Sequence, residues 1–320
     1  MKVHFFDVGE GDSTFFELPD GKTMLIDAGK TNEGPVVVQD IKSLGYKKID
    51  YLVTSHPDAD HIGGVPAVMS AFAVGEVWAP KVAHTTKTYE NFLDAVKNKG
   101  LSIRAAQAGK QIGPASQYSV DILSPAVGAA YRDLNDWSVI IKVTHKKNTM
   151  LFVGDASSDV ILAAGSRQVD LYKVGHHGSK TSTNAAVVES LTPEYNVISV
   201  GQNSYGHPVG TVLELLSKYQ VYRTDHSGTV IAYSDGSHIT FNTKPSAYQA
   251  PARETKEVAP VQAQTPSSSQ NLDVVVYITK TGQKYHKDGC SYLSKSKIPI
   301  SLSEAIAEGK TPCSRCRPPQ

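Results

Sequence analysis

Four potential metal ligands lie within six residues of one another, directly after an apolar run at 49–55 that predicts a buried strand. The ligands are His56, Asp58, Asp60 and His61. A loop that leaves a strand can bring several side chains to one point, and imidazole with carboxylate suits Zn²⁺, Mn²⁺ or Fe²⁺. A polar loop that caps the next helix is the alternative, but four ligands at this density favour a metal site.

Two later predicted strands are also followed by side chains that can bind a metal ion. Asp155 follows the apolar run 149–154, and the pair His176 and His177 follows the run 170–175 with glycine on both sides. Either feature alone is compatible with a simple turn. Together, the segments predict one site whose ligands come from separate strand ends. The predicted metal ligands are His56, Asp58, Asp60, His61, Asp155, His176 and His177.

The alternation of strands and helices predicts a layered α/β fold. Two β-rich segments, KVHFFDV and STFFEL, bracket a glycine-containing turn and predict an opening hairpin, and KTMLIDAG predicts a third strand. Apolar residues at helical spacing predict a helix over 34–45. Further strands are expected at 49–55, 138–145, 149–154, 170–175, 195–201 and 228–234, and further helices after residue 63, near 184–191 and over 209–218.

Residues 244–272 interrupt this pattern, because they are rich in Pro, Ala, Gln and Ser and contain almost no large apolar side chains. Such a segment buries too little surface to fold, so we expect a disordered linker. The chain then divides into a large domain at 1–243, the linker at 244–272 and a small module at 273–320. The formal net charge of +1 neither favours nor excludes a nucleic-acid partner.

We expect no membrane span in this chain, since no apolar run is long enough to cross a bilayer. The N-terminus has no apolar segment after its basic residue and does not resemble a signal peptide. A cytoplasmic location is therefore expected unless a leader has been removed, in which case the protein is secreted. No protein partner is evident from the sequence.

All three cysteines lie in the small module, in the pattern His286-x3-Cys290 and Cys313-x2-Cys316 with 22 residues between the two pairs. An odd number of cysteines is a poor disulfide framework, whereas three thiolates and one imidazole form a closed tetrahedral set for structural Zn²⁺. A unit of this size has too little core to be stable alone, so a metal ion is a physically reasonable support. Free cysteines beside an unrelated histidine are the alternative.

Several motifs of the large domain occur in the order used by one known family. They are FFDVGEGDSTFFEL, LIDAG, TSHPDADHIGG, NDWSVIIKV, LFVGDAS, KVGHHGSKTS and SVGQNSYGHP. With these motifs, residues 2–243 resemble the metallo-β-lactamase superfamily, and more narrowly the C-terminal hydrolase domain of ComEC-type competence proteins. The resemblance implies an αββα sandwich, with a site for one or two divalent metals at one edge of its two sheets.

The chain departs from the general pattern of that superfamily at two positions. Asp58 stands where the H-x-H-x-D-H loop has its second histidine. Asn135, Asp136 and Ser138 stand where a further ligand histidine is expected. The extra carboxylate shifts the expected preference toward harder ions, so Mn²⁺ is a rival to Zn²⁺.

The resemblance implies a metal-dependent hydrolase, with DNA phosphodiesters as the substrate of a metal-activated water. In that reaction Asp155 bridges two ions, and Asp60 orients the water or accepts its proton. His207 is expected to protonate the leaving oxygen, while Lys180 supplies a point charge to the phosphate unless it is merely solvated. The other predicted substrate contacts are Ser179, Ser182 and Asn203.

Two other functions remain open: hydrolysis of small phosphodiesters or lactones, and a catalytically silent protein that binds metal or DNA. The reduced histidine set argues mildly against lactone chemistry, and the intact Asp60, His61 and Asp155 argue against loss of turnover. Because this chain has no membrane channel, a free-standing nuclease or phosphodiesterase is expected rather than a transport protein.

The small module is similar to the metal-binding domain of the Ada DNA-repair protein, in which four cysteines hold zinc. His286 stands where that family has its first cysteine, the methyl acceptor, so methyl transfer is not expected. Contact with DNA and a merely solvated surface are both open interpretations of the basic residues in this module. These residues are Lys280, Lys284, Lys287, Lys295, Lys297, Lys310, Arg315 and Arg317.

Overall fold

The computed structural model describes residues 1–113, 116–246, 275–279, 282–293, 296–307, 309–316 and 318. The chain divides into two compact units, Met1–Arg253 and Glu254–Gln320, which we call the large and the small unit and describe separately. The linker predicted at 244–272 lies outside the described residues, apart from its first three. Within the described parts of the chain, no helix is both long and apolar enough to cross a membrane.

The first sheet of the large unit has eight strands in the order β14-β13-β1-β2-β3-β4-β5-β6. Its opening hairpin, predicted from the sequence, is confirmed by the antiparallel pairing of β1 with β2. From β3 to β6 the strands run parallel, so the loops that follow them leave from one edge. The strands are β1 (Lys2–Phe5), β2 (Thr14–Glu17), β3 (Thr23–Ile26), β4 (Lys48–Val53), β5 (Ala73–Pro80), β6 (Ile103–Ala106), β13 (Val230–Ser234) and β14 (Ile239–Phe241).

The second sheet has six strands in the order β12-β11-β10-β9-β8-β7. Strands β9, β10, β11 and β12 run parallel, and so their carboxyl ends also share one edge. Successive residues such as Met150–Phe152 on β9 and Leu171–Lys173 on β10 are buried on both faces, as expected for parallel strands covered on both sides. The strands are β7 (Tyr118–Ser124), β8 (Ile140–His145), β9 (Asn148–Phe152), β10 (Leu171–Lys173), β11 (Tyr195–Ile198) and β12 (Gln220–Arg223).

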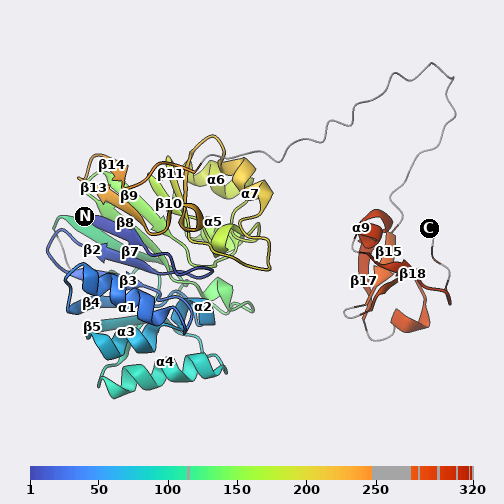
Figure 1. Ribbon diagram of the computed structural model, residues 1–320, viewed down its shortest axis with the longest axis horizontal. Coiled ribbons are helices and arrows are strands. Elements are labelled where there is room, and N and C mark those ends of the chain that lie inside the picture. The colour runs from blue at the N-terminus through green and yellow to red at the C-terminus, as the bar shows by residue number, and fades with distance from the viewer. Residues whose placement is uncertain are drawn as a thin grey trace, which may run out of the picture. The chain divides into compact units, whose positions relative to one another are not determined.

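Helices cover the outer faces of both sheets (Figure 1). On the first sheet they are α1 (Gly34–Ser43), α2 (Ala59–Ile62), α3 (Val65–Ala71) and α4 (Lys87–Asn98), and on the second α5 (Ser158–Ala163), α6 (Ala185–Leu191) and α7 (Gly210–Leu216). A short α8 (Thr224–Ser227) follows β12. Separate apolar clusters fill the space under each helical layer. The sandwich thus has four layers, and the αββα prediction is confirmed.

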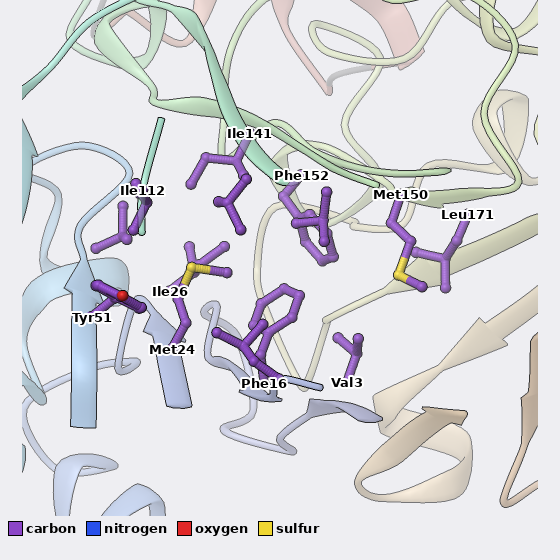
Figure 2. Packing of buried hydrophobic residues seen from close by; sticks show 14 of the residues in the cluster. Val3, Phe16, Met24, Ile26, Tyr51, Ile112, Ile141, Met150, Phe152 and Leu171 are labelled. Carbon is purple, nitrogen blue, oxygen red and sulfur yellow. The ribbon is translucent and has the colours of Figure 1, made fainter. Parts of the chain in front are cut away.

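A third apolar cluster lies between the two sheets (Figure 2). Phe16 and Met24 enter it from the first sheet, and Ile141 and Phe152 enter it from the second. The rings of Phe16 and Phe152 meet edge to face with their centroids 5.0 Å apart. Burial of such side chains from both sheets holds the sheets face to face, and this alignment brings their loop-bearing edges together.

The small unit has a four-stranded sheet in the order β17-β15-β16-β18, with one helix. Its core is small and centres on Val276, Tyr285 and Ala305. The segment SLSEAIAEG contains helix α9. The elements are β15 (Val275–Ile278), β16 (Lys284–His286), β17 (Ile298–Ser301), α9 (Leu302–Ala307) and β18 (Thr311–Pro312), with a 3-10 turn at Ser291–Leu293.

Candidate metal centre

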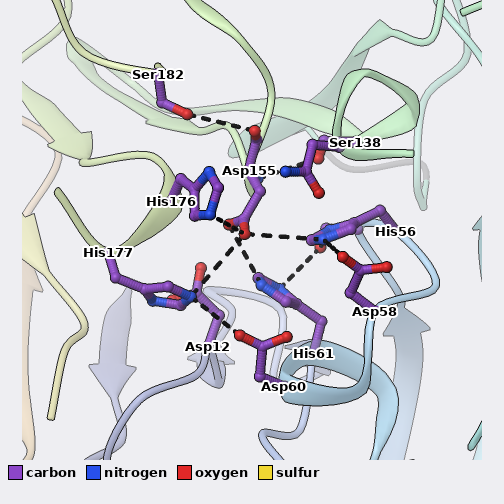
Figure 3. Close-up of polar contacts among 12 residues, drawn as sticks. Asp12, His56, Asp58, Asp60, His61, Ser138, Asp155, His176, His177 and Ser182 are labelled. Carbon is purple, nitrogen blue, oxygen red and sulfur yellow. Dashed lines mark hydrogen bonds and ion pairs between the residues drawn. The ribbon is translucent and has the colours of Figure 1, made fainter. Parts of the chain in front are cut away.

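The predicted metal ligands of the large unit gather where the two sheets meet at their loop-bearing edges (Figure 3). The loop after β4 supplies His56 and Asp58, and the short helix α2 that follows it supplies Asp60 and His61. The loop after β9 supplies Asp155, and the segment after β10 supplies His176 and His177. Glycine permits one of these close approaches, because a Cβ at Gly64 would overlap the carbonyl oxygen of Ala28. Both sheets therefore contribute to one cluster.

Asp155 lies at the centre of this cluster and is almost fully buried. Its Oδ1 is 3.3 Å from Nε2 of His61, and its Oδ2 is 3.6 Å from Nε2 of His176. Nε2 of His56 and Nε2 of His177 are 3.8 and 4.0 Å from Oδ2. One carboxylate is thus surrounded by four imidazole rings from two loops.

Two further aspartates extend the cluster. Asp60 Oδ2 is 3.4 Å from Nε2 of His177, and Asp58 Oδ2 is 3.7 Å from Nε2 of His56. Two overlapping ligand groups result, each with its ligand atoms within 4.8 Å of one another. They are His56 with His61 and Asp155, and Asp60 with His61 and His177.

The buried atoms that face the centre of the cluster have no hydrogen-bond partner among the described residues. They are Nε2 of His56, His61 and His177, together with Oδ1 of Asp155. Buried polar atoms without partners are costly, so their convergence on one point needs a physical explanation. A divalent cation satisfies nitrogen and carboxylate donors together, and this donor set fits either Zn²⁺ or Mn²⁺.

Asp27, in the loop after β3, fixes the orientation of His61. Its carboxylate accepts hydrogen bonds from the Ser55 amide at 2.7 Å and the Ser55 hydroxyl at 2.6 Å. It also lies 2.8 Å from Nδ1 of His61, so Nδ1 donates to it and Nε2 is left to face the cluster. Asp27 belongs to the LIDAG motif, but the motif alone assigned it no role, and its support of His61 appears only in the structure.

Three cluster residues have left-handed backbones, with φ angles of 59° at Asp27, 50° at His176 and 52° at His177. Such a backbone costs about 1–3 kcal/mol at a residue other than glycine. The successive left-handed residues turn the rings of His176 and His177 82° from each other. His176 consequently faces Asp155, while His177 also reaches Asp60.

The carboxylates give the cluster a negative field that favours cations. Burial lowers the pKa of His177, but Asp155, Asp60 and Asp12 together raise it to about 9. Burial raises the pKa of Asp155, yet the neighbouring rings of His61 and His177 hold it well below its usual value. A site that retains protons on buried imidazoles in this way is electrostatically suited to hold a metal cation in their place.

The residues that stand in place of the missing ligand histidine support the Asp155 loop. Ser138 Oγ accepts a hydrogen bond from the Asp155 amide at 3.1 Å, and Asp136 accepts one from the Ser157 amide at 3.1 Å. Ser182, which we predicted to contact substrate, is fully buried and donates to the Asp155 carbonyl at 3.3 Å. These contacts fix the backbone that carries the central carboxylate.

The other predicted substrate contacts differ in their surroundings. Asn203 uses both ends of its amide within its own loop: it donates to the carbonyls of Gly201 and His207 and accepts from the amides of Tyr205 and His207. Ser179 is buried, and its hydroxyl pairs with that of Thr181 at 2.9 Å. Lys180 is the exposed member of the predicted set.

His207 lies beside the ligand cluster rather than within either ligand group. Its ring centroid is 5.4 Å from that of His176 and 6.4 Å from that of His177. His207, the predicted proton donor, thus lies against His176, whose own ring faces the central Asp155 carboxylate.

A buried ion pair next to the site was not predicted from the sequence. Lys173 Nζ, at the end of β10, donates to both oxygens of Asp12 at 2.8 and 2.9 Å. Asp12 Oδ1 is also 3.5 Å from Nδ1 of His177, whose own hydrogen bond goes to the carbonyl of Ser199 at 3.0 Å. Because Asp12 follows β1, the pair joins the two sheets beside the cluster.

The small unit has a ligand group of its own, in which Cys290, Cys313 and Cys316 surround His286. The four ligand atoms lie within 4.8 Å of one another. Nδ1 of His286 is 3.2 Å from the Cys290 sulfur and 3.8 Å from the Cys316 sulfur. All three cysteines are free thiols, so the predicted set of one imidazole and three thiolates is brought together.

The large unit has two facing sheets, covered by helices on both outer sides, and it carries histidine and aspartate side chains at one shared edge. These features define a protein of the αββα class with a candidate metal site. The chain belongs to the metallo-beta-lactamase superfamily, whose family model matches residues 6–202 and whose members are mostly metal-dependent hydrolases. This agrees with the resemblance predicted from the motifs of the large domain. The resemblance of the small unit to the Ada domain stays a prediction.

The chain is similar to three curated proteins, in agreement with the ComEC-type resemblance expected from its sequence. The chain is 29% identical to ComE operon protein 3 of Bacillus subtilis (strain 168) over 254 residues, which cover 72% of the chain and 32% of that protein. It is 30% identical to Recombination protein 2 of Haemophilus influenzae over 242 residues, which cover 72% and 28%. Competence protein ComA of Neisseria gonorrhoeae is 26% identical over 237 residues, which cover 71% and 31%. The chain thus spans about a third of these relatives or less.

Proposed function

We propose that the large unit is a metal-dependent phosphodiesterase that hydrolyses DNA. The observation that carries this proposal is the Asp155 carboxylate, which faces four imidazoles. Three of these rings, those of His56, His61 and His177, have a buried nitrogen without a hydrogen-bond partner among the described residues. The names of two relatives, a recombination protein and a competence protein, favour DNA as the substrate.

Two sets of residues would hold divalent cations. One set is Asp60, His61 and His177, and the other is His56, His61 and Asp155, with Asp58 3.7 Å from His56. A bound divalent cation supplies charge to neutralise a phosphate and lowers the pKa of water, so that hydrolysis proceeds at neutral pH.

The side chains around these sets would orient the reacting groups. Burial raises the pKa of Asp60, but the ring of His177 and the charge of His61 lower it below its usual value, so this carboxylate stays ionised. It would orient the attacking water and accept its proton. His207 would give a proton to the leaving oxygen, and exposed Lys180 would attract the phosphodiester backbone.

The test compares the full-length protein with two variants, Asp60→Ala and the control Asp159→Asn, whose carboxylate is exposed on α5. Single- and double-stranded DNA, a small phosphodiester and a lactone are incubated with Mn²⁺, with Zn²⁺ or with a chelator. We expect metal-dependent DNA cleavage that the chelator and Asp60→Ala abolish and that Asp159→Asn retains. Cleavage of only the small diester or the lactone, or no turnover in metal-loaded protein, would contradict the proposal.

For the small unit we propose a structural Zn²⁺ held by His286, Cys290, Cys313 and Cys316, and contact with DNA through neighbouring basic residues. Arg315 packs over the exposed ring of Tyr292, 5.5 Å from the ring centroid, close to this ligand group. A cation stacked on an aromatic ring suits both phosphate and base contacts. Of the other basic residues in the predicted set, Lys280, Lys295 and Arg317 lie outside the described residues.

The DNA contact is tested by the affinity of full-length protein for single-stranded DNA at two salt concentrations. We expect Arg315→Ala to weaken binding and to reduce its salt dependence. Lys142→Ala, on β8 of the large unit, is the matched control. Unchanged affinity in Arg315→Ala would show that the basic residues of the small unit are only solvated.

A further inference from the structure

Two buried polar atoms outside the ligand cluster face each other without a hydrogen-bond partner among the described residues. They are Oε1 of Glu10 and Nδ1 of His207, which lie 3.4 Å apart. Both side chains are largely buried. Two unpaired groups of complementary chemistry at this distance indicate an interaction that a small side-chain movement completes.

Glu10 is held in place by the close approach of two loops. It lies in the loop after β1, and its Oε2 accepts a hydrogen bond from the amide of Gly201 at 3.1 Å. Gly201 follows β11, on the second sheet, and a Cβ at this position would overlap the backbone of Gly9 and Glu10. The absence of a side chain at Gly201 therefore allows the Glu10 carboxylate to reach across the edges of both sheets.

His207 is held by the amide of Asn203, which bonds to both the amide and the carbonyl of His207 at 3.0 and 2.8 Å. One flank of its ring packs against His176, whose Nε2 is 3.6 Å from Asp155. Tyr205, 74% exposed, stacks near the ring with centroids 5.8 Å apart. The His207 ring thus lies between the buried Glu10 carboxylate and the rim of the ligand cluster.

We propose that Glu10 is a positioning residue for His207. Its Oε1 accepts the proton on Nδ1 of His207, which fixes the ring so that Nε2 is the nitrogen presented to the substrate. The Glu10 carboxylate thereby orients the histidine without contacting the substrate itself.

The consequence for hydrolysis rests on the phosphodiesterase proposed above. The water oxygen forms a bond to phosphorus, and the bond from phosphorus to the leaving oxygen breaks. In this step His207 starts as the imidazolium, with a proton on each ring nitrogen. The water proton passes to Asp60, the Nε2 proton of His207 passes to the leaving oxygen, and the ring keeps its Nδ1 proton toward Glu10, so charge and atoms balance. Solvent then returns the proton from Asp60 to His207. Glu10 acts by keeping Nε2 directed toward that oxygen throughout.

Glu10→Gln is the informative substitution. The wild-type carboxylate accepts from Gly201 N and, in the proposed arrangement, would also accept from His207 Nδ1, which lies 3.4 Å away. Glutamine has the same shape but only one oxygen, so it can accept from only one of them. If its amide nitrogen faces His207, Nδ1 must become the acceptor and the proton moves to Nε2. The control is Glu189→Gln, whose side chain is exposed on α6.

The first measurement is the ¹⁵N spectrum of the histidine rings in full-length, zinc-loaded protein, with His207 assigned by its loss in His207→Ala. We expect a proton on Nδ1 of His207 in the wild type and in Glu189→Gln, and a shift of that proton toward Nε2 in Glu10→Gln. A His207 spectrum that Glu10→Gln leaves unchanged would overturn the proposal. This readout does not depend on turnover.

The second measurement compares a dinucleotide, whose alkoxide leaving group needs a proton, with a thymidine p-nitrophenyl phosphodiester, whose leaving group does not. We expect His207→Ala to slow dinucleotide hydrolysis by about 100-fold or more and Glu10→Gln to slow it by about tenfold. The nitrophenyl ester should lose less than about threefold in either variant. Equal losses on both substrates would overturn the positioning role.

The double variant separates positioning from a general loss of structure. If Glu10 acts through His207, Glu10→Gln should change the dinucleotide rate by less than about twofold in the His207→Ala background. An undiminished effect in that background would show that Glu10 only braces Gly201 and would overturn the proposal. If the wild type hydrolyses neither diester, the proposed phosphodiesterase fails, and the ring spectrum alone decides the role of Glu10.

Discussion

Asp155 Oδ1 and His61 Nε2 lie 3.3 Å apart at the junction of the two sheets, and neither atom forms a hydrogen bond within the described chain. Each is nevertheless held in place from behind, since Ser138 accepts from the Asp155 amide and Asp27 pairs with Nδ1 of His61. The site is thus prearranged for a ligand between these atoms, because its supports do not depend on that ligand.

Asp155→Asn should remove most of the metal affinity of the large unit, because the central carboxylate faces every imidazole of the cluster. We expect a loss of at least about 100-fold in Mn²⁺ affinity, measured by calorimetry on chelator-treated protein. Mn²⁺ is the informative ion, since the thiolates of the small unit prefer softer metals. Asp159→Asn should bind Mn²⁺ as the wild type does, and wild-type affinity in Asp155→Asn would contradict this assignment.

Asp27→Asn should weaken the site without removing a ligand. The change removes one of the two carboxylate oxygens that accept hydrogen bonds from Ser55 and His61, so the orientation of His61 is weakened. We expect the Mn²⁺ affinity to fall by about 10- to 100-fold. The same calorimetric titration measures it, with Asp94→Asn on the exposed face of α4 as the control. A loss as large as that of Asp155→Asn would indicate that Asp27 is itself a ligand.

Lys173→Met should destabilise the large unit by about 3–5 kcal/mol, because it leaves the Asp12 carboxylate buried without its partner. Denaturant unfolding measures the change. The double variant Lys173→Met with Asp12→Asn removes both charges and should recover most of the loss. Equal stability of Lys173→Met and the wild type would show that Asp12 finds another compensating charge.

In metal-free protein, stability should fall as the pH rises toward 9. The pKa of His177 is raised in the folded state from 6.5 to about 9, so its protonated ring stabilises the fold fully below pH 6.5 and loses that effect through pH 9. Thermal unfolding with a chelator at several pH values checks this. His177→Gln should flatten the decline, whereas His238→Gln, at an 81% exposed position, should not.

Cys313→Ser should lower the zinc content of the purified protein by one ion per chain. This cysteine is buried in the four-ligand group of the small unit, and an incomplete set binds zinc far more weakly. Native mass spectrometry counts the ions, and Co²⁺ substitution reports thiolate ligands by their absorption. Ser314→Ala, between the paired cysteines, should keep the full complement, and an unchanged zinc count in Cys313→Ser would exclude the site.

The residues of the candidate centre could be singled out from the sequence because their signal is local. His56 to His61 are neighbours in the chain, and Asp155 and His177 each follow an apolar strand. Because the carboxyl ends of the parallel strands meet at one edge of each sheet, the residues that follow these strands come close together in space. The apolar runs likewise predicted most strands of the second sheet, although several end earlier than expected, as β11 does at Ile198.

Other features could not be predicted because they depend on tertiary contacts. Strand β6, with its partly exposed IRAA pattern, has no clear alternation. Helix α4 was missed for another reason, since its signal is local: Thr86 caps it, and its buried residues Phe92 and Val96 recur at helical spacing. The Asp12–Lys173 and Glu10–His207 pairs join residues far apart in the chain, so no spacing rule reveals them. The motif does not reveal that the amide of Asn203 bonds within its own loop, and the substrate contact expected of Asn203 stays a prediction.

The origin of the ligands from both sheets has a consequence for unfolding. His56 and His61 extend from the first sheet, and Asp155 and His177 from the second, so an ion bound among them would fasten one half of the sandwich to the other. Occupancy of the centre should then slow amide hydrogen exchange at the ends of β4 and β10 together, with little change at strands remote from this edge. Resistance to proteolysis would in this way report whether a cation is bound at the candidate centre.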